Sequence, residues 1–317
     1  MQKRFSLGGV LALAGLLVFL LAALPAAEDP PRFSEWSAPV YLGSPVNTAF
    51  TEAGSFITKD GLSLYFSSAR PDGYGGLDLW VSERATINDG WGEPRNLGDN
   101  VNTVGSDTTP IVSVDGHWLY FATDRPEGFG TLDIWVSRRH DKRDNLGWQL
   151  PVNLGSAINS PYVERGPTRF EDDATGDIVL YFSSTRPGGL GGEDIYASTL
   201  QPDGTWAPAV NIETLNSTVN DSVPSIRRDG LEIFLCSPRT GQLGGTDLWV
   251  ATRPSTADAW SEPVNLGAVV NSTYLDFRPA ISFDGTALYF HSARPPGGSA
   301  NYDLYVTTRT KEKGKPD

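Results

Sequence analysis

One segment occurs five times in this chain, and that repetition constrains the fold more than any other feature. The first copy, LYFSSARPDGYGGLDLWV, begins at Leu64. Related copies begin at Leu119, Leu180, Ile233 and Leu288. A tryptophan opens each repeating unit, and these residues are spaced 54 to 58 positions apart: Trp36, Trp91, Trp148, Trp206 and Trp260. A period of this size indicates stacked supersecondary units, such as the blades of a propeller.

Each unit contains the signals of four short strands. An Asp-Gly dipeptide such as Asp60-Gly61 follows the first strand and indicates a tight hairpin. The LYFSS-type and LDLWV-type segments are the second and third strands, joined by an Arg-Pro-x-Gly loop. The Trp-x-x-Pro segment is the fourth and outermost strand, where proline is tolerated because no ladder donor is needed. The 34 glycines and 23 prolines suit many short strands joined by turns.

The order of these strand types predicts how the ring closes. A strand of the outermost type, at residues 36–43, precedes the first inner strands, while the last unit ends after its third strand near Arg309. The N-terminal strand would therefore complete the last blade and leave no free edge. We expect an all-β chain, a single five-bladed β-propeller of four-stranded blades over residues 36–310, closed by its N-terminal strand.

The first 27 residues have the pattern of an export signal. Lys3 and Arg4 precede an apolar run over residues 7–24, and small residues follow at Ala26 and Ala27. The apolar run approaches the length of a membrane span, so an uncleaved anchor is the alternative. We expect a linker at residues 28–35, a disordered tail at 311–317, and an exported protein that is periplasmic, secreted or anchored at its N-terminus.

Charge, cysteine and histidine content narrow the function. The formal net charge of -13 repels phosphate backbones, which argues against nucleic acid as a partner. The one cysteine, Cys236, cannot form an intramolecular disulfide, and we interpret it as a small buried residue. His117, His140 and His291 are scattered without metal-ligand spacing. His291 stands where other copies have small second-strand residues, and we interpret it as a packing residue.

The repeat resembles the WD40-like repeat of the PD40 type, which occurs in TolB-like proteins and beside OmpA-like domains of bacterial envelope proteins. The residues that carry the resemblance are Asp-Gly, followed by Leu-Tyr-Phe-x-Ser-x-Arg-Pro-x-Gly-x-Gly-Gly-x-Asp, and they recur over most of the chain. The resemblance implies a β-propeller that contacts other proteins and acts as a scaffold in the envelope.

Two kinds of charged residue recur in every unit. An acid stands at the start of each innermost strand: Glu52, Asp107, Glu164, Asp221 and Asp276. An arginine stands in each loop after the second strand: Arg70, Arg125, Arg186, Arg239 and Arg294. Both positions open on one face, so we expect a ring around the channel in which two-pronged arginine–carboxylate bonds fix the loops. Ca²⁺ held by the five carboxylates is the functional alternative, and no other cofactor or metal is expected.

Positions at which the copies diverge are candidates for a binding site. Arg165 and Arg278 lie beside or near the acid of their own strand and have no counterpart in the other blades. Tyr162, Tyr274 and Phe277 are aromatic residues of the same face. Arginine and aromatic residues dominate binding hot spots. Packing of the loops against the next blade explains these residues equally well.

These observations predict an exported binding or scaffolding module of the bacterial envelope, whose loops contact a protein partner. The alternative is a glycan-binding or glycoside-hydrolysing propeller that uses channel carboxylates, because glycosidases place two acids about 5 to 9.5 Å apart. Five nearly equivalent acids lack the difference in environment that separates a catalytic acid from its partner. We therefore leave enzymatic activity open, favour a non-enzymatic function and assign no catalytic residue.

Overall fold

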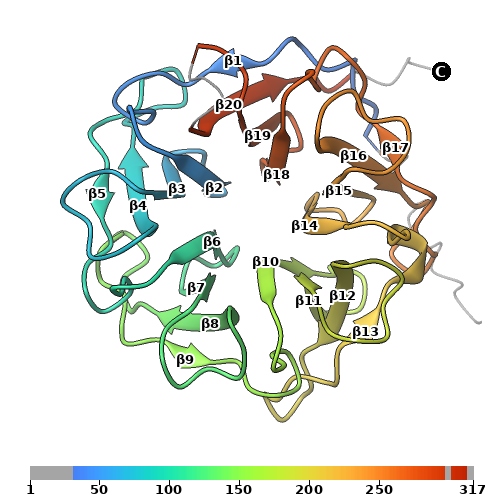
Figure 1. Cartoon of the computed structure of the whole chain (residues 1–317), viewed down its shortest axis with the longest axis horizontal. Helices are drawn as coiled ribbons and strands as arrows, with labels where there is room; N and C mark the ends of the chain where they lie inside the picture. Colours follow the sequence, from blue (N-terminus) through green and yellow to red (C-terminus); the bar gives the residue numbers. More distant parts are fainter. Residues whose placement is uncertain (1–30, 297–300, 313–317) are drawn as a thin grey trace, which may run out of the picture.

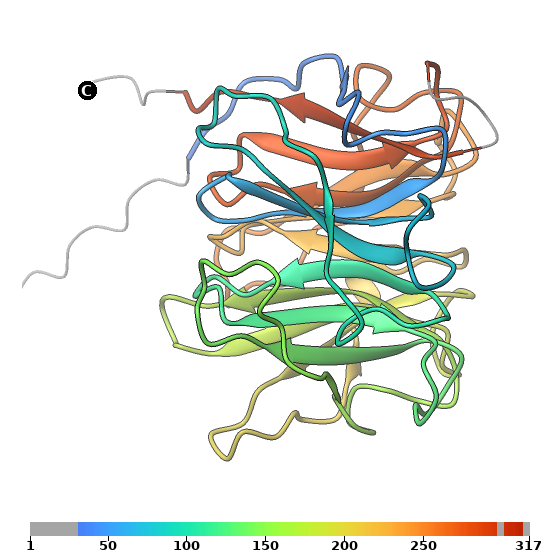
Figure 2. The same cartoon turned by 90° about the vertical axis from the view of Figure 1, so that its left-hand side faces the viewer.

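The computed structural model describes residues 31–296 and 301–312, which form five four-stranded sheets around a central axis (Figure 1). Neighbouring strands within each sheet are antiparallel. Figure 2 shows the strands running between two opposite faces at which the loops gather. The predicted five-bladed propeller is confirmed. The expected leader and most of the expected tail lie outside the described residues, within which no helix is long and apolar enough to cross a bilayer.

Each blade places one strand against the channel and three strands outside it. The first blade contains β2 (Glu52–Ile57), β3 (Ser63–Ser68), β4 (Asp78–Glu83) and β5 (Arg95–Asn96). The second contains β6 (Asp107–Val112), β7 (Trp118–Thr123), β8 (Asp133–Arg138) and β9 (Val152–Asn153). The third contains β10 (Glu164–Glu171), β11 (Ile178–Ser184), β12 (Asp194–Thr199) and β13 (Val210–Asn211).

The fourth and fifth blades follow the same order. After the short helix η1 (Glu213–Leu215), the fourth blade contains β14 (Ser222–Ile226), β15 (Glu232–Ser237), β16 (Asp247–Thr252) and β17 (Val264–Asn265). The fifth contains β18 (Asp276–Ile281), β19 (Ala287–Ser292), β20 (Asp303–Thr308) and, at its outer edge, β1 (Val40–Tyr41). The outermost strands are shorter than the sequence indicated, because a proline such as Pro39 supplies no N–H to the ladder.

The apolar LYF motif packs on both sides of its sheet. Leu64 and Phe66 lie in the core between the first and fifth blades, whereas Tyr65 lies in the core between the first and second. Side chains alternate along a strand, so a motif that is buried on both faces is apolar at every position. One such core fills each of the five interfaces between neighbouring blades.

The N-terminal strand closes the ring as predicted. In β1, Val40 pairs with Val306 and Tyr41 pairs with Tyr305 of β20. A second contact lies further out, where Phe33 forms a bridge with Lys311 and its ring lies 3.8 Å from the Arg309 guanidinium. The two ends of the described chain are therefore held in one blade.

Candidate functional site at the loop face

The loop face is the face at which the innermost strands begin, and the turn face is the opposite one, which carries the Asp-Gly turns. The five repeated acids stand at or directly before the start of these strands, and each is fully buried with no exposed side-chain surface. The carboxylate of Asp276 accepts bonds from the backbone N–H and the hydroxyl of Ser272 at 2.6 and 2.8 Å. It also accepts a bond from Arg294 at 2.5 Å. The same arrangement recurs in the other blades, so protein donors occupy the carboxylates.

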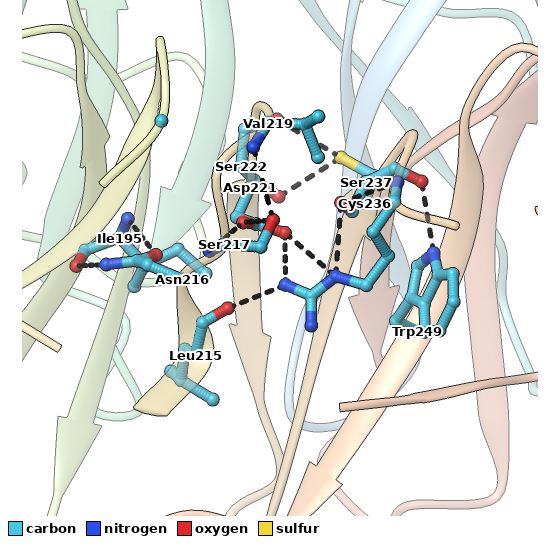
Figure 3. A network of polar contacts seen from close by, with 12 residues as sticks. Ile195, Leu215, Asn216, Ser217, Val219, Asp221, Ser222, Cys236, Ser237 and Trp249 are labelled. Carbon is cyan, nitrogen blue, oxygen red and sulfur yellow. Dashed lines mark hydrogen bonds and ion pairs between the residues drawn. The ribbon is translucent and has the colours of Figure 1, made fainter. Parts of the chain in front are cut away.

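Each loop arginine connects three parts of the fold. Figure 3 shows the network of the fourth blade, in which Asp221, Ser237 and Leu215 are labelled. The Arg239 guanidinium donates to all three of these residues. The expected two-pronged pair does not form in the five described networks. The guanidinium instead divides its donors between one carboxylate oxygen, a hydroxyl of its own blade and a backbone carbonyl of the preceding loop.

Burial raises the pKa of Asp107, and it lowers the pKa of Arg70. In both cases the opposite charge of the ion-pair partner acts against the effect of burial. Among the described residues, no group of three His, Cys, Asp or Glu side chains is arranged to hold a metal ion.

A ring of left-handed backbone lies just inside the acids. The third residue of the innermost segment has a φ between 50° and 61° in every blade: Gly54, Thr109, Gly166, Val223 and Arg278. A β-bulge interrupts the ladder at this point, and the chain approaches its neighbours closely. A Cβ atom on Gly166 would lie 2.9 Å from the Val223 Cα atom. We call this ring the αL ring, and all five of its residues line the channel.

Below the αL ring, a cavity follows the axis towards the turn face. Its wall contains the residue after each αL position (Ser55, Pro110, Pro167, Pro224 and Pro279), followed by apolar residues such as Ile111 and Phe170. Arg278 lines the upper end of the cavity. The channel wall is therefore mainly apolar in its middle, with Arg278 at the end near the loop face and further charged side chains at the turn-face end: Lys59, Arg169, Glu171, Arg227 and Arg228.

Six side chains, each of a residue type that no other blade has at the same position, meet where the channel reaches the loop face. We call them the mouth cluster: Arg165, Glu193, Phe277, Arg278, His291 and Tyr302. Arg165 donates from Nε and Nη2 to the two carboxylate oxygens of Glu193, both at 2.6 Å. Glu193 is only 4% exposed. Its side-chain bonds raise the pKa of Arg165, although burial opposes the shift.

Arg278 reaches from the fifth blade to the second. Its Nη1 donates to the Thr108 hydroxyl at 2.6 Å, a contact between residues 170 positions apart in the sequence. Its Nε is buried without a hydrogen-bond partner, and within residues 31–296 and 301–312 no carboxylate forms an ion pair with it. Burial and the nearby positive charge of Arg165 lower the pKa of Arg278 to about 10. It therefore remains a cation at neutral pH.

Aromatic rings connect the two arginines to the surface. The Phe277 ring lies 5.6 Å from the Arg165 guanidinium and 5.6 Å from the His291 ring, which lies 5.0 Å from the ring of Tyr302. The His291 Nδ1 atom accepts a long hydrogen bond of 3.5 Å from the Gly54 N–H. Burial, followed by the charges of Arg278 and Arg165, lowers the pKa of His291 well below its usual value.

Three of the five divergent residues from the sequence belong to this cluster: Arg165, Phe277 and Arg278. The side chains of Tyr162 and Tyr274 are 44% and 40% exposed on the same face, and no described contact joins them to the cluster. Their carbonyls instead fit against Gly130 and Gly244 of the preceding blades, where a Cβ would overlap them.

Sequence reasoning missed Glu193 and the place of His291 in this site. Glu193 precedes the third strand, a position that Leu77, Leu132 and Thr246 occupy in other units. The difference in residue type at this position could have identified Glu193 as a candidate from the sequence.

No family model and no curated protein matches this chain. Similar solved structures do exist. An α-L-arabinofuranosidase from Lactobacillus brevis is 16% identical, with a TM-score of 0.59 over 88% of this chain and 98% of the other. An α-L-arabinofuranosidase from Podospora anserina in complex with cellotriose is 14% identical, with a TM-score of 0.56 over 89% and 98%. A GH62 hydrolase in complex with xylotriose is 13% identical, with a TM-score of 0.57 over 86% and 97%.

These likenesses correct two expectations. The assignment to PD40 and TolB-like propellers is wrong, because the similar structures are glycoside hydrolase propellers. The envelope scaffold with a protein partner, which depended on that assignment, is wrong for the same reason. The motif was a poor guide to family and function because its residues stabilise the blade. The apolar triplet fills the cores between blades, and the acid, the arginine and the glycines fix the loops. The chain has the five-bladed fold of the arabinofuranosidase and xylosidase structures.

Proposed function

We propose that this protein binds glycans at the mouth cluster. The observation that carries the proposal is the gathering of one-of-a-kind side chains, from blades that otherwise repeat, at the end of the channel on the loop face. Repeated residues serve the fold five times, whereas a ligand needs one site. The proposal is supported by the likeness to glycoside hydrolase propellers, two of which contain cellotriose and xylotriose.

The chemistry of the cluster suits a sugar. A sugar ring has an apolar face of C–H groups and a rim of hydroxyls. The Tyr302 side chain is 36% exposed and Phe277 is partly buried, so an aromatic surface is accessible for stacking. The Arg165–Glu193 pair provides fixed charged donors and acceptors beside these rings, and hydrogen bonds to charged groups are the stronger kind.

Hydrolysis is a second candidate, which the names of the similar structures favour. Hydrolysis needs two accessible carboxyl groups about 5 to 9.5 Å apart. The five repeated acids are fully buried and bonded to protein donors, and Glu193 is bonded through both oxygens to Arg165. These six carboxylates are therefore occupied by protein donors, which favours binding over hydrolysis at the mouth cluster.

Calorimetric titration with cellotriose, xylotriose and arabinose-substituted xylo-oligosaccharides tests binding. We expect at least one of these ligands to bind, and Tyr302→Ala and Phe277→Ala to weaken it about tenfold or more, because each removes a stacking surface. Phe283→Ala is the matched control, since Phe283 belongs to the same blade but lines the channel at its turn-face end. Absence of binding, or equal losses in all three variants, would contradict the proposal.

Release of reducing sugar from the same ligands tests hydrolysis. Turnover that is lost in Glu193→Gln, or in Glu164→Gln and Asp276→Asn, would favour an enzyme. Binding without turnover would leave a glycan-binding propeller.

We also propose that the chain is exported, on the basis of the leader pattern in residues 1–27. The mass of the protein isolated from its own cells tests this. A chain that begins at or near Glu28 is expected, and an intact N-terminus would support the anchor instead.

A further inference from the structure

The mouth cluster contains an unbalanced positive charge. Arg165 and Glu193 form a two-pronged pair, so their charges cancel. The repeated acids are also neutralised, because each has its own loop arginine. Arg278 has no such partner among the described residues, and its one side-chain bond goes to the neutral hydroxyl of Thr108.

The fold does not require a cation at this position. The equivalent residues of the αL ring are Gly54, Thr109, Gly166 and Val223, all uncharged and in the same backbone conformation. An uncharged side chain could also fill the channel. A cation that is desolvated without an anion destabilises a protein, and the lowered pKa of Arg278 reflects that cost. Such a residue is a candidate for ligand binding.

The atoms of Arg278 are arranged to receive an anion. The bond from Nη1 to Thr108 fixes the guanidinium across the channel. Nε has no protein partner. A carboxylate is the anion that matches a guanidinium best, because its two oxygens accept parallel bonds from two N–H groups. Phe277 lies 6.0 Å from the guanidinium and offers the adjoining apolar surface.

We propose that the glycan bound at the mouth cluster carries a carboxylate, that of a uronic acid residue, and that Arg278 binds it. This inference rests on the proposed glycan-binding function and narrows it to acidic sugars. Because the net charge of -13 disfavours acidic polymers over the molecule as a whole, we expect Arg278 to provide the attraction for the acid at the mouth cluster.

The test uses the full chain and a panel of oligosaccharides that contain glucuronic or galacturonic acid. Each is compared with its own methyl ester, which keeps the sugar skeleton and removes the charge. We expect the free acid to bind about tenfold or more tightly than the ester, and the difference to shrink as salt is raised. Arg278→Thr should abolish the difference between acid and ester, and Arg278→Lys should retain part of it.

Arg278→Thr introduces the residue that the second blade carries in the same conformation, so the backbone is expected to accept it. Val223→Thr is the matched control, at the same position of the αL ring without a change of charge. The wild-type comparison of acid with ester decides the question even if the arginine variants do not fold.

Equal binding of acid and ester would overturn the acidic-sugar inference and leave glycan binding intact. Binding of neutral oligosaccharides only would do the same. If no member of either panel binds, both the inference and the proposed function are wrong.

Discussion

His291 shows how one residue at a repeated position changes the chemistry around it. The other copies have Ser67, Ala122, Ser183 and Cys236 in its place. His291 is 3% exposed, lies between the rings of Phe277 and Tyr302, and faces two arginines. Burial and the positive charges of Arg278 and Arg165 disfavour a further positive charge there, so the lowered pKa keeps the imidazole neutral at neutral pH.

This neutrality predicts a pH dependence of stability. Unfolded histidine has a pKa of about 6.5, and the folded pKa of His291 is well below it. Its contribution to stability is therefore complete above about pH 6.5 and is lost as the pH falls below that, by up to about 1.4 kcal/mol per pH unit. Urea unfolding of the wild type and His291→Gln from pH 7.5 to 5 measures it. We expect the wild type to lose stability relative to the variant below pH 6.5; a constant difference would contradict the assignment.

The residue scale is also where sequence reasoning reached its limit. The repeat aligned Arg165, Phe277 and Arg278 with the channel because their position relative to the acid is fixed by the strand. It could not place Arg278 against Thr108, because that contact crosses the ring between the second and fifth blades. A repeat predicts what equivalent residues share, and side chains that occur once make contacts that no other copy reveals.

At the scale of the strand, the αL ring explains why the innermost segments carry glycine in the first and third blades. Gly54 and Gly166 have positive φ, and both also lie against the backbone of the following blade. Thr109 and Val223 show that the conformation alone does not demand glycine, although it is rare for β-branched residues. Close approach of neighbouring strands is therefore the stronger requirement in these two blades.

The variants Gly166→Ala and Gly98→Ala separate the cost of the positive φ from the cost of the close approach between neighbouring strands. Gly98 also has a positive φ, of 85°, but no atom lies within 4 Å of the position that a Cβ would occupy. Gly98→Ala should cost about 1 kcal/mol for the backbone conformation alone. Gly166→Ala should cost about 1 to 3 kcal/mol more, because its Cβ would press on the Val223 Cα. Urea unfolding measures both, and equal losses would show that the ring relaxes without strain.

At the scale of the whole molecule, the sequence was sufficient for the architecture. Five copies of one unit gave the number of blades, and the displaced outermost strand near Trp36 gave the closure. The extent of this closure could not be predicted from the sequence. The ladder of β1 covers Val40–Tyr41 only. The additional contact of Phe33 with Arg309 and Lys311 depends on where both ends of the ring meet.

Removal of residues 31–43 tests how much the ring depends on this closure. The deletion exposes the edge of β20 and removes Trp36 and Tyr41 from the core between the fourth and fifth blades. Loss of one large aromatic residue from a core typically costs about 3 to 5 kcal/mol, and we expect at least this loss. We also expect unfolding in more than one step, because the fifth blade would no longer be held from both sides.

Scanning calorimetry and urea unfolding measure the loss, with removal of residues 313–317 as the control for shortening the chain. The full chain and the control should unfold in one cooperative transition. A variant without residues 31–43 that unfolds in the same single transition, at the same urea concentration, would show that packing between blades holds the ring without its N-terminal strand. Closure would then be a way to cover the edge of β20, which is otherwise open to pairing with another chain.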